Sequence, residues 1–98
     1  MTHDNTKTSV IVSAVLRELE RAQSKWPAFH SQHEGAAVIR EEHDELWDEV
    51  RRSKRVTACG TTAIEAMQVA AMAIRFIVDL CDQDEFADTL RGYERSQQ

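Results

Sequence analysis

The stretch EGAAVIREEHDELWDE, residues 34–49, combines an apolar stripe with a group of acidic side chains, and the rest of the chain is organised around it. At about 100° per residue, Ile39, Leu46 and Val50 fall within about 40° of one another. Ala36 and Trp47 widen the stripe on one side. This periodicity predicts one amphipathic helix whose apolar face is buried.

A column of acids borders the apolar stripe. Glu42, Glu45 and Glu49 lie about 60 to 120° round the helix from it, whereas Glu41 points roughly away, towards water. Like charges three or four residues apart cost a few tenths of a kcal/mol per pair, and shelter beside a core would raise their pKa values. Two interpretations stay open. The acids are either a charge run exposed to water, or a column that binds a positively charged group.

The composition is that of one small globular domain, residues 1–98. The chain is 42% hydrophobic and 30% charged, which excludes a disordered protein. The net charge of −5, without a basic block, argues against nucleic acid or an anionic membrane as the main partner. Cys59 and Cys81 form no C-x-x-C pair, and no signal pattern or transmembrane span stands out, so we expect a reduced, cytoplasmic protein.

Capping and breaker signals divide the chain into four expected helices. We expect residues 1–7 to be a flexible N-terminus and residues 53–60 a loop, and Trp26-Pro27 to end the first helix. Gly92 is expected to weaken the last helix. No stretch alternates as a half-buried strand would, so we predict an all-α antiparallel bundle. The expected N-caps are Ser9, Ser31, Thr62 and Asp82.

The third expected helix, residues 63–80, is apolar nearly all round and should be central and buried. Its polar residues share a stripe about 80° wide. Unpaired buried charges cost several kcal/mol, so the stripe should face the acid column of the preceding helix. The stripe consists of Glu65, Gln68, Arg75 and Asp79.

This polar stripe has two interpretations. The first is a purely structural network, in which Glu65 caps its own helix and Arg75 pairs with Asp79 or with an acid of the preceding helix. The second is a divalent-cation site, because Mg²⁺ binds through a few carboxylates and takes phosphates as further ligands. Its ligands would be Glu42, Glu45 and Glu65, helped by Glu49 or Gln68. Substrate contacts are expected from Arg75, Lys54, Arg55, His33 and Asp79.

At these residues the chain resembles a known family. E-E-x-x-E at residues 41–45, followed by E-x-x-Q at residues 65–68, is similar to the E-E-x-x-E … E-x-x-D signature of the all-α nucleoside triphosphate pyrophosphohydrolases, the MazG-like superfamily. Residues 33–50 and 65–77 are especially similar to small MazG-like proteins of bacteria and phages. The resemblance covers about residues 29–80.

The resemblance implies hydrolysis of (d)NTPs to monophosphate and pyrophosphate, with Mg²⁺ or Mn²⁺, for nucleotide pool control. By position, Glu42, Glu45 and Glu65 would be metal ligands, and Glu41 would order or deprotonate the attacking water. It also implies a bundle completed by oligomerisation, as a homodimer or dimer of dimers, with substrate near the subunit interface. The apolar third helix independently favours a homo-oligomer.

Gln68 departs from the family pattern, which has Asp at this position. A glutamine offers a neutral oxygen, so the site should hold its metal less tightly. Glu49, one turn beyond Glu45, could compensate, as could the more distant Asp79. The alternative function is therefore a catalytically weak helical module that binds a nucleotide or a protein partner.

Overall fold

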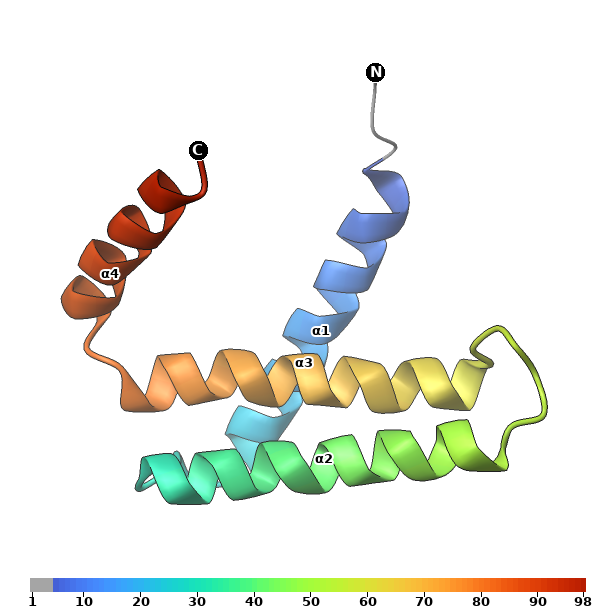
Figure 1. Cartoon of the computed structure of the whole chain (residues 1–98). Helices are drawn as coiled ribbons and strands as arrows, with labels where there is room; N and C mark the ends of the chain where they lie inside the picture. Colours follow the sequence, from blue (N-terminus) through green and yellow to red (C-terminus); the bar gives the residue numbers. More distant parts are fainter. Residues whose placement is uncertain (1–4) are drawn as a thin grey trace.

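The computed structural model describes residues 5–98 and consists of four helices joined by short connections (Figure 1). No strand occurs within this range, so the all-α prediction is confirmed. None of the helices in these residues is both long and apolar enough to cross a membrane. The helices are α1 (Thr6–Lys25), α2 (Gln32–Arg52), α3 (Gly60–Leu80) and α4 (Gln83–Ser96).

The pair formed by α2 and α3 is the centre of the fold. The two helices run antiparallel and side by side, and α1 crosses α3 at an angle (Figure 1). Val15, Leu19 and Ala22 lie at i, i+4 and i+7 of α1, which places them on one face, and this face packs on Ala71 and Met72 of α3. No large side chain among the described residues is completely buried, so this core is small.

Two of the predicted helix caps are confirmed. The Ser31 side chain accepts a hydrogen bond from the backbone N–H of Glu34 at 3.1 Å, and Asp82 caps α4 through the N–H of Glu85 at 2.9 Å. These bonds satisfy amide groups that have no partner inside the helix. The α1–α2 and α3–α4 corners are therefore fixed by local side-chain chemistry.

The other two predicted caps are wrong. Ser9 lies inside α1, because its backbone N–H already bonds to the carbonyl of Asn5 at 2.8 Å. Thr62 lies inside α3, whose N-cap is Cys59, and the Thr62 hydroxyl is 3.2 Å from the Cys59 sulfur. Of the expected flexible N-terminus, residues 1–7, residues 6 and 7 belong to α1, and residues 1–4 lie outside the described range.

α4 departs from the predicted bundle because it does not cover α2 and α3 within one copy of the chain (Figure 1). Only Cys81 and Asp82 separate it from α3. Gln83 fixes this corner, since its amide nitrogen donates to the carbonyls of Ile77 at 3.2 Å and Cys81 at 3.0 Å. α4 is unbroken at Gly92, contrary to the expected weakening.

Candidate functional site

Three glutamates from two helices converge between α2 and α3. Glu42 and Glu45 lie one turn apart on α2, and Glu65 lies opposite them on α3. One carboxylate oxygen from each residue lies within 4.8 Å of the other two. The antiparallel packing of α2 on α3 thus assembles one carboxylate cluster, defined here as Glu42, Glu45 and Glu65.

The carboxylate cluster is electrostatically crowded. Oε2 of Glu42 and Oε2 of Glu65 are buried and have no hydrogen-bond partner among the described residues. Burial raises the pKa of Glu42, and the neighbouring Glu45 and Glu65 carboxylates raise it further. Burial followed by the charges of Glu45 and Glu49 raises the pKa of Glu65. The repulsion between these carboxylates is relieved either when two carboxyl groups share a proton or when a cation binds.

The three residues of the carboxylate cluster could hold a metal ion. Oxygen ligands on opposite sides of one Mg²⁺ are about 4.2 Å apart, and those of Ca²⁺ about 5 Å. The oxygens of the carboxylate cluster lie within 4.8 Å of one another, and they would have to move closer together to share one ion, because neighbouring oxygen ligands of Mg²⁺ are about 3 Å apart. Because α3 is capped at Cys59, Glu65 does not cap its own helix.

Glu49 and Gln68 flank the carboxylate cluster from opposite directions. Glu49 is half-buried and pairs with Arg52 at 3.7 Å, yet its charge still contributes to the raised pKa of Glu65. Gln68 is half-buried and lines a neighbouring cavity. Both residues lie close to the carboxylate cluster, but neither belongs to the set of three converging oxygens.

A cavity of about 470 Å³ adjoins the carboxylate cluster. It lies between the end of α1, the α1–α2 connection, α2 and α3, and Glu42 belongs both to its wall and to the cluster. Glu41 is exposed at the same wall. The remaining wall is largely apolar, with Ala22, Trp26, Pro27, Phe29, Val38 and Met72.

Arg75 also reaches the cavity wall, but its donors are engaged within the protein. Its side chain is 3% exposed and donates to the carbonyls of Ala22 at 3.4 Å, Trp26 at 2.7 Å and Pro27 at 2.8 Å. Nε of Arg75 donates to Asp79 at 3.1 Å. The polar stripe of α3 is therefore divided: Glu65 and Gln68 face the acidic region, whereas Arg75 and Asp79 hold the α1–α2 connection.

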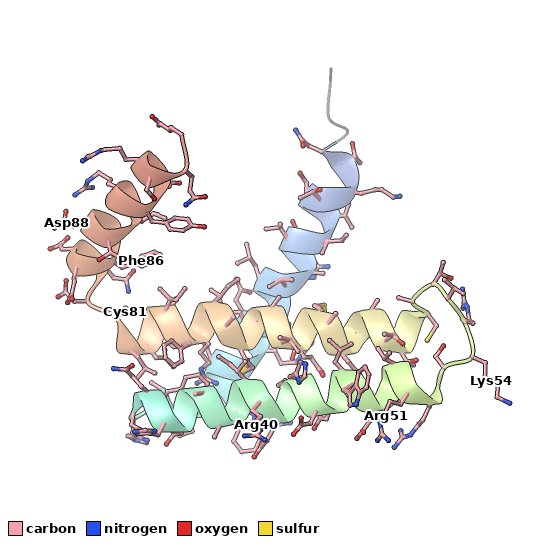
Figure 2. All side chains as sticks on the ribbon, viewed as in Figure 1. Arg40, Arg51, Lys54, Cys81, Phe86 and Asp88 are labelled. Carbon is pink, nitrogen blue, oxygen red and sulfur yellow. The ribbon has the colours of Figure 1, made fainter. Side chains whose placement is uncertain are left out.

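The structure does not bring the other predicted substrate contacts to the cavity. Lys54 and Arg55 are exposed in the α2–α3 connection, where Lys54 points away from both helices (Figure 2). His33 is exposed in the first turn of α2 and is absent from the described cavity wall. Among the described residues that line the cavity, Arg75 is the only basic one.

Two acids of the cavity wall were not predicted. Glu18 of α1 has a side chain that is 13% exposed and pairs with Arg21. Glu18 lies three residues after Val15, which places it on the buried face of α1. This spacing is the sequence signal that could have identified it. Glu34 was predicted only as part of a capping box, yet it lines the cavity and accepts a hydrogen bond from the N–H of His30 at 3.2 Å.

No family model, curated protein or solved structure matches this chain.

Proposed function

We propose that this protein is a Mg²⁺-dependent nucleoside triphosphate pyrophosphohydrolase of the MazG-like type, producing a monophosphate and pyrophosphate. The observation that carries the proposal is the carboxylate cluster, in which two buried oxygens have no partner in the described part of the chain. A divalent cation would supply the missing positive charge. The signature similarity at residues 41–45 and 65–68 supports the same assignment.

The adjoining cavity supports a nucleotide as the substrate. Its volume of about 470 Å³ lies within the range of small-molecule sites. Trp26, Pro27, Phe29 and Met72 offer an apolar surface for a base, while Glu41 and Glu42 mark the acidic end. The phosphates would lie at this acidic end, beside the carboxylate cluster.

An anion cannot bind to this acidic end without a cation. Glu18, Glu34, Glu41 and Glu42 line the cavity, and most donors of Arg75 are already used. The metal would change the local electrostatic potential from negative to positive. It would also stabilise charge on the phosphates and lower the pKa of a bound water. Glu42, Glu45 and Glu65 would hold it, with Glu49 and Gln68 as neighbours, and Glu41 would accept the proton of the attacking water.

The proposal includes a cytoplasmic setting, where nucleotide substrates are plentiful, and assembly into a homo-oligomer. The alternative is a module that binds a nucleotide or a protein without turnover. Gln68 favours this alternative, because a neutral amide stands at the cavity wall where the family signature has a carboxylate. Gln68→Asp should tighten Mg²⁺ binding by about 10-fold, equivalent to about 1.4 kcal/mol.

The experiment is a panel of NTPs and dNTPs incubated with Mg²⁺, Mn²⁺ or EDTA, in which monophosphate and pyrophosphate are quantified. Metal-dependent monophosphate that disappears in Glu42→Gln, Glu45→Gln and Glu65→Gln supports the enzyme. Asp44→Asn is the matched control, since it removes one charge from an exposed position of α2. Metal binding without turnover of any nucleotide would support the module, and the absence of both would refute the site.

A further inference from the structure

Glu18 is an acid of the cavity wall that the proposed metal site does not use. It lies on α1 and is not one of the three converging glutamates of α2 and α3. The charges that raise the pKa of Glu42 come from Glu45, Glu65 and Glu41, and Glu18 is not among them. Glu18 is therefore a separate acidic point on the α1 side of the cavity.

The α1 wall of the cavity is apolar except for this carboxylate. Glu18, Ala22 and Trp26 lie at i, i+4 and i+8, which places them on one face of α1, and all three line the cavity. Successive members of the set are about 6 Å apart along the helix axis. A planar ring that lies on Ala22 and Trp26 can therefore present its edge to Glu18.

Glu18 keeps one oxygen free to accept a hydrogen bond. Its Oε1 accepts from Arg21, whose side chain is 64% exposed, whereas its Oε2 makes no hydrogen bond within residues 5–98. The Glu18 side chain is only 13% exposed. Glu34, the other wall acid with a partner, is 44% exposed and has both oxygens near His30, one 3.2 Å from its N–H and one 3.4 Å from Nδ1. Glu18 is thus the sheltered acceptor that a ligand can use.

A carboxylate distinguishes the nucleobases by their hydrogen-bond donors. An ionised carboxylate only accepts hydrogen bonds, and it binds best to two adjacent N–H groups. The Watson–Crick edge of guanine carries such a pair, N1–H beside the N2 amino group. Adenine and cytosine place an acceptor nitrogen next to their amino group, and uracil and thymine place their N–H between two carbonyl oxygens. Guanine is therefore the base that suits Glu18.

We propose that Glu18 determines base specificity and selects guanine nucleotides, by accepting hydrogen bonds from N1–H and the N2 amino group of a base that lies on Ala22 and Trp26. This inference rests on the proposed function and names its substrate class. A hydrogen bond to a charged group is strong enough to favour guanine by at least about 10-fold. Other bases would leave the carboxylate facing an acceptor, and sites built for a donor reject such ligands.

The first test measures kcat/KM with Mg²⁺ for dGTP, dITP, dATP, dCTP and dTTP. dITP differs from dGTP only by lacking the N2 amino group, so dGTP should exceed it by at least about 10-fold. Glu18→Gln should lower kcat/KM for dGTP by a similar factor and raise it for dATP, because an amide both donates and accepts, as the adenine edge requires. A merely damaged fold cannot produce the gain with dATP. Glu20→Gln, at an exposed position of the same helix, is the matched control.

The second test needs neither metal nor turnover. Saturation-transfer NMR in EDTA compares guanosine, inosine and adenosine, which carry no phosphate. Guanosine should bind at least about 10-fold more tightly than inosine, and this difference should disappear in Glu18→Gln and persist in Glu20→Gln.

The two tests separate the failure of this inference from the failure of the proposed function. If the protein hydrolyses nucleotides, the kinetic pattern decides, and turnover without a guanine preference, or a preference that survives Glu18→Gln, overturns the role of Glu18 while the enzyme stands. If it hydrolyses none, the nucleoside pattern decides. Guanosine binding that depends on Glu18 then supports the inference within a module that binds a nucleotide, and its absence overturns the inference.

Discussion

Arg75 and Asp79 form a buried ion pair on α3 that fastens the connection between α1 and α2. Asp79 accepts the backbone N–H of Phe29 at 3.0 Å, while Arg75 donates to three carbonyls at the end of α1 and in the connection. The guanidinium also lies 5.1 Å from the centre of the Phe29 ring. The pairing of these two residues was one of the predicted structural alternatives, and their position sets the wall of the cavity.

Arg75→Leu should destabilise the fold strongly. Removing the guanidinium leaves Asp79 buried without its charged partner, which costs about 3–5 kcal/mol in comparable buried pairs. Urea denaturation followed by circular dichroism measures the free energy of unfolding. Arg95→Leu, at an exposed position of α4, is the control and should change it by less than about 0.5 kcal/mol. Unchanged stability together with lost nucleotide binding would instead make Arg75 a substrate ligand.

Glu42→Gln should stabilise the metal-free protein at neutral pH. The substitution removes like-charge contacts with Glu45 and Glu65 that raise the pKa of Glu42. At a few tenths of a kcal/mol per contact, we expect the Tm in EDTA to rise by about 2–4 °C. Asp44→Asn should leave it nearly unchanged. A lower Tm for Glu42→Gln would show that the cluster is not crowded in the absence of metal.

The same crowding predicts a pH dependence of stability. The folded state raises the pKa of Glu42 and Glu65 above their ordinary value of 4.5, so it binds protons more tightly than the unfolded state. The destabilisation of the folded state by these two carboxyl groups is absent below about pH 4.5. It reaches its full value once the pH exceeds their folded-state pKa values. In EDTA, Glu42→Gln, Glu65→Gln should therefore gain most over wild type at the alkaline end of the series. A difference that grows towards acid pH would contradict this sign.

Gly35→Ala should destabilise the packing of α2 on α3. A Cβ at Gly35 would lie 2.7 Å from Cδ2 of Phe76 and 3.1 Å from atoms of both Leu80 and Phe29. Overpacking costs about 1–3 kcal/mol, which exceeds the gain of up to about 1 kcal/mol in helix propensity. At Gly92 a Cβ would meet nothing within 4 Å, so Gly92→Ala should stabilise the protein. Urea denaturation of both variants measures the contrast, and equal effects would argue against the close approach at Gly35.

Cys59 should react as a thiolate near neutral pH. The hydroxyl groups of Thr61 and then Thr62, together with the backbone N–H of Thr62, lower the pKa of the Cys59 thiol from 9.0 to about 6. In a Cys81→Ser chain, the rate of iodoacetamide alkylation should rise with pH with a midpoint near 6, followed by mass spectrometry. Thr61→Val should move the midpoint upward. A wild-type midpoint close to 9 would show that the hydroxyl groups do not stabilise the thiolate.

Local sequence signals were enough for the helices and for two of their caps. The side-chain oxygens of Ser31 and Asp82 each accept a hydrogen bond from the backbone N–H three residues later. This relationship depends only on residues that are close together in the sequence. Thr62 gave the same signal and was misassigned, because the helix can begin earlier, at Gly60, when the Cys59 sulfur contacts the threonine hydroxyl instead. A capping motif shows where a helix can begin, but it does not show which of two nearby start positions gives the better packing.

By itself, the sequence determined that the chain is helical and that acids at residues 42, 45 and 65 share faces which can meet, because helical periodicity is a local property. Only the tertiary structure decided how the polar stripe of α3 divides between the acidic region and the α1–α2 connection. That division depends on where α1 crosses α3, which brings the carbonyls of residues 22, 26 and 27 to Arg75. Contacts between residues some fifty positions apart have no local signature, so no spacing along the chain could have revealed them.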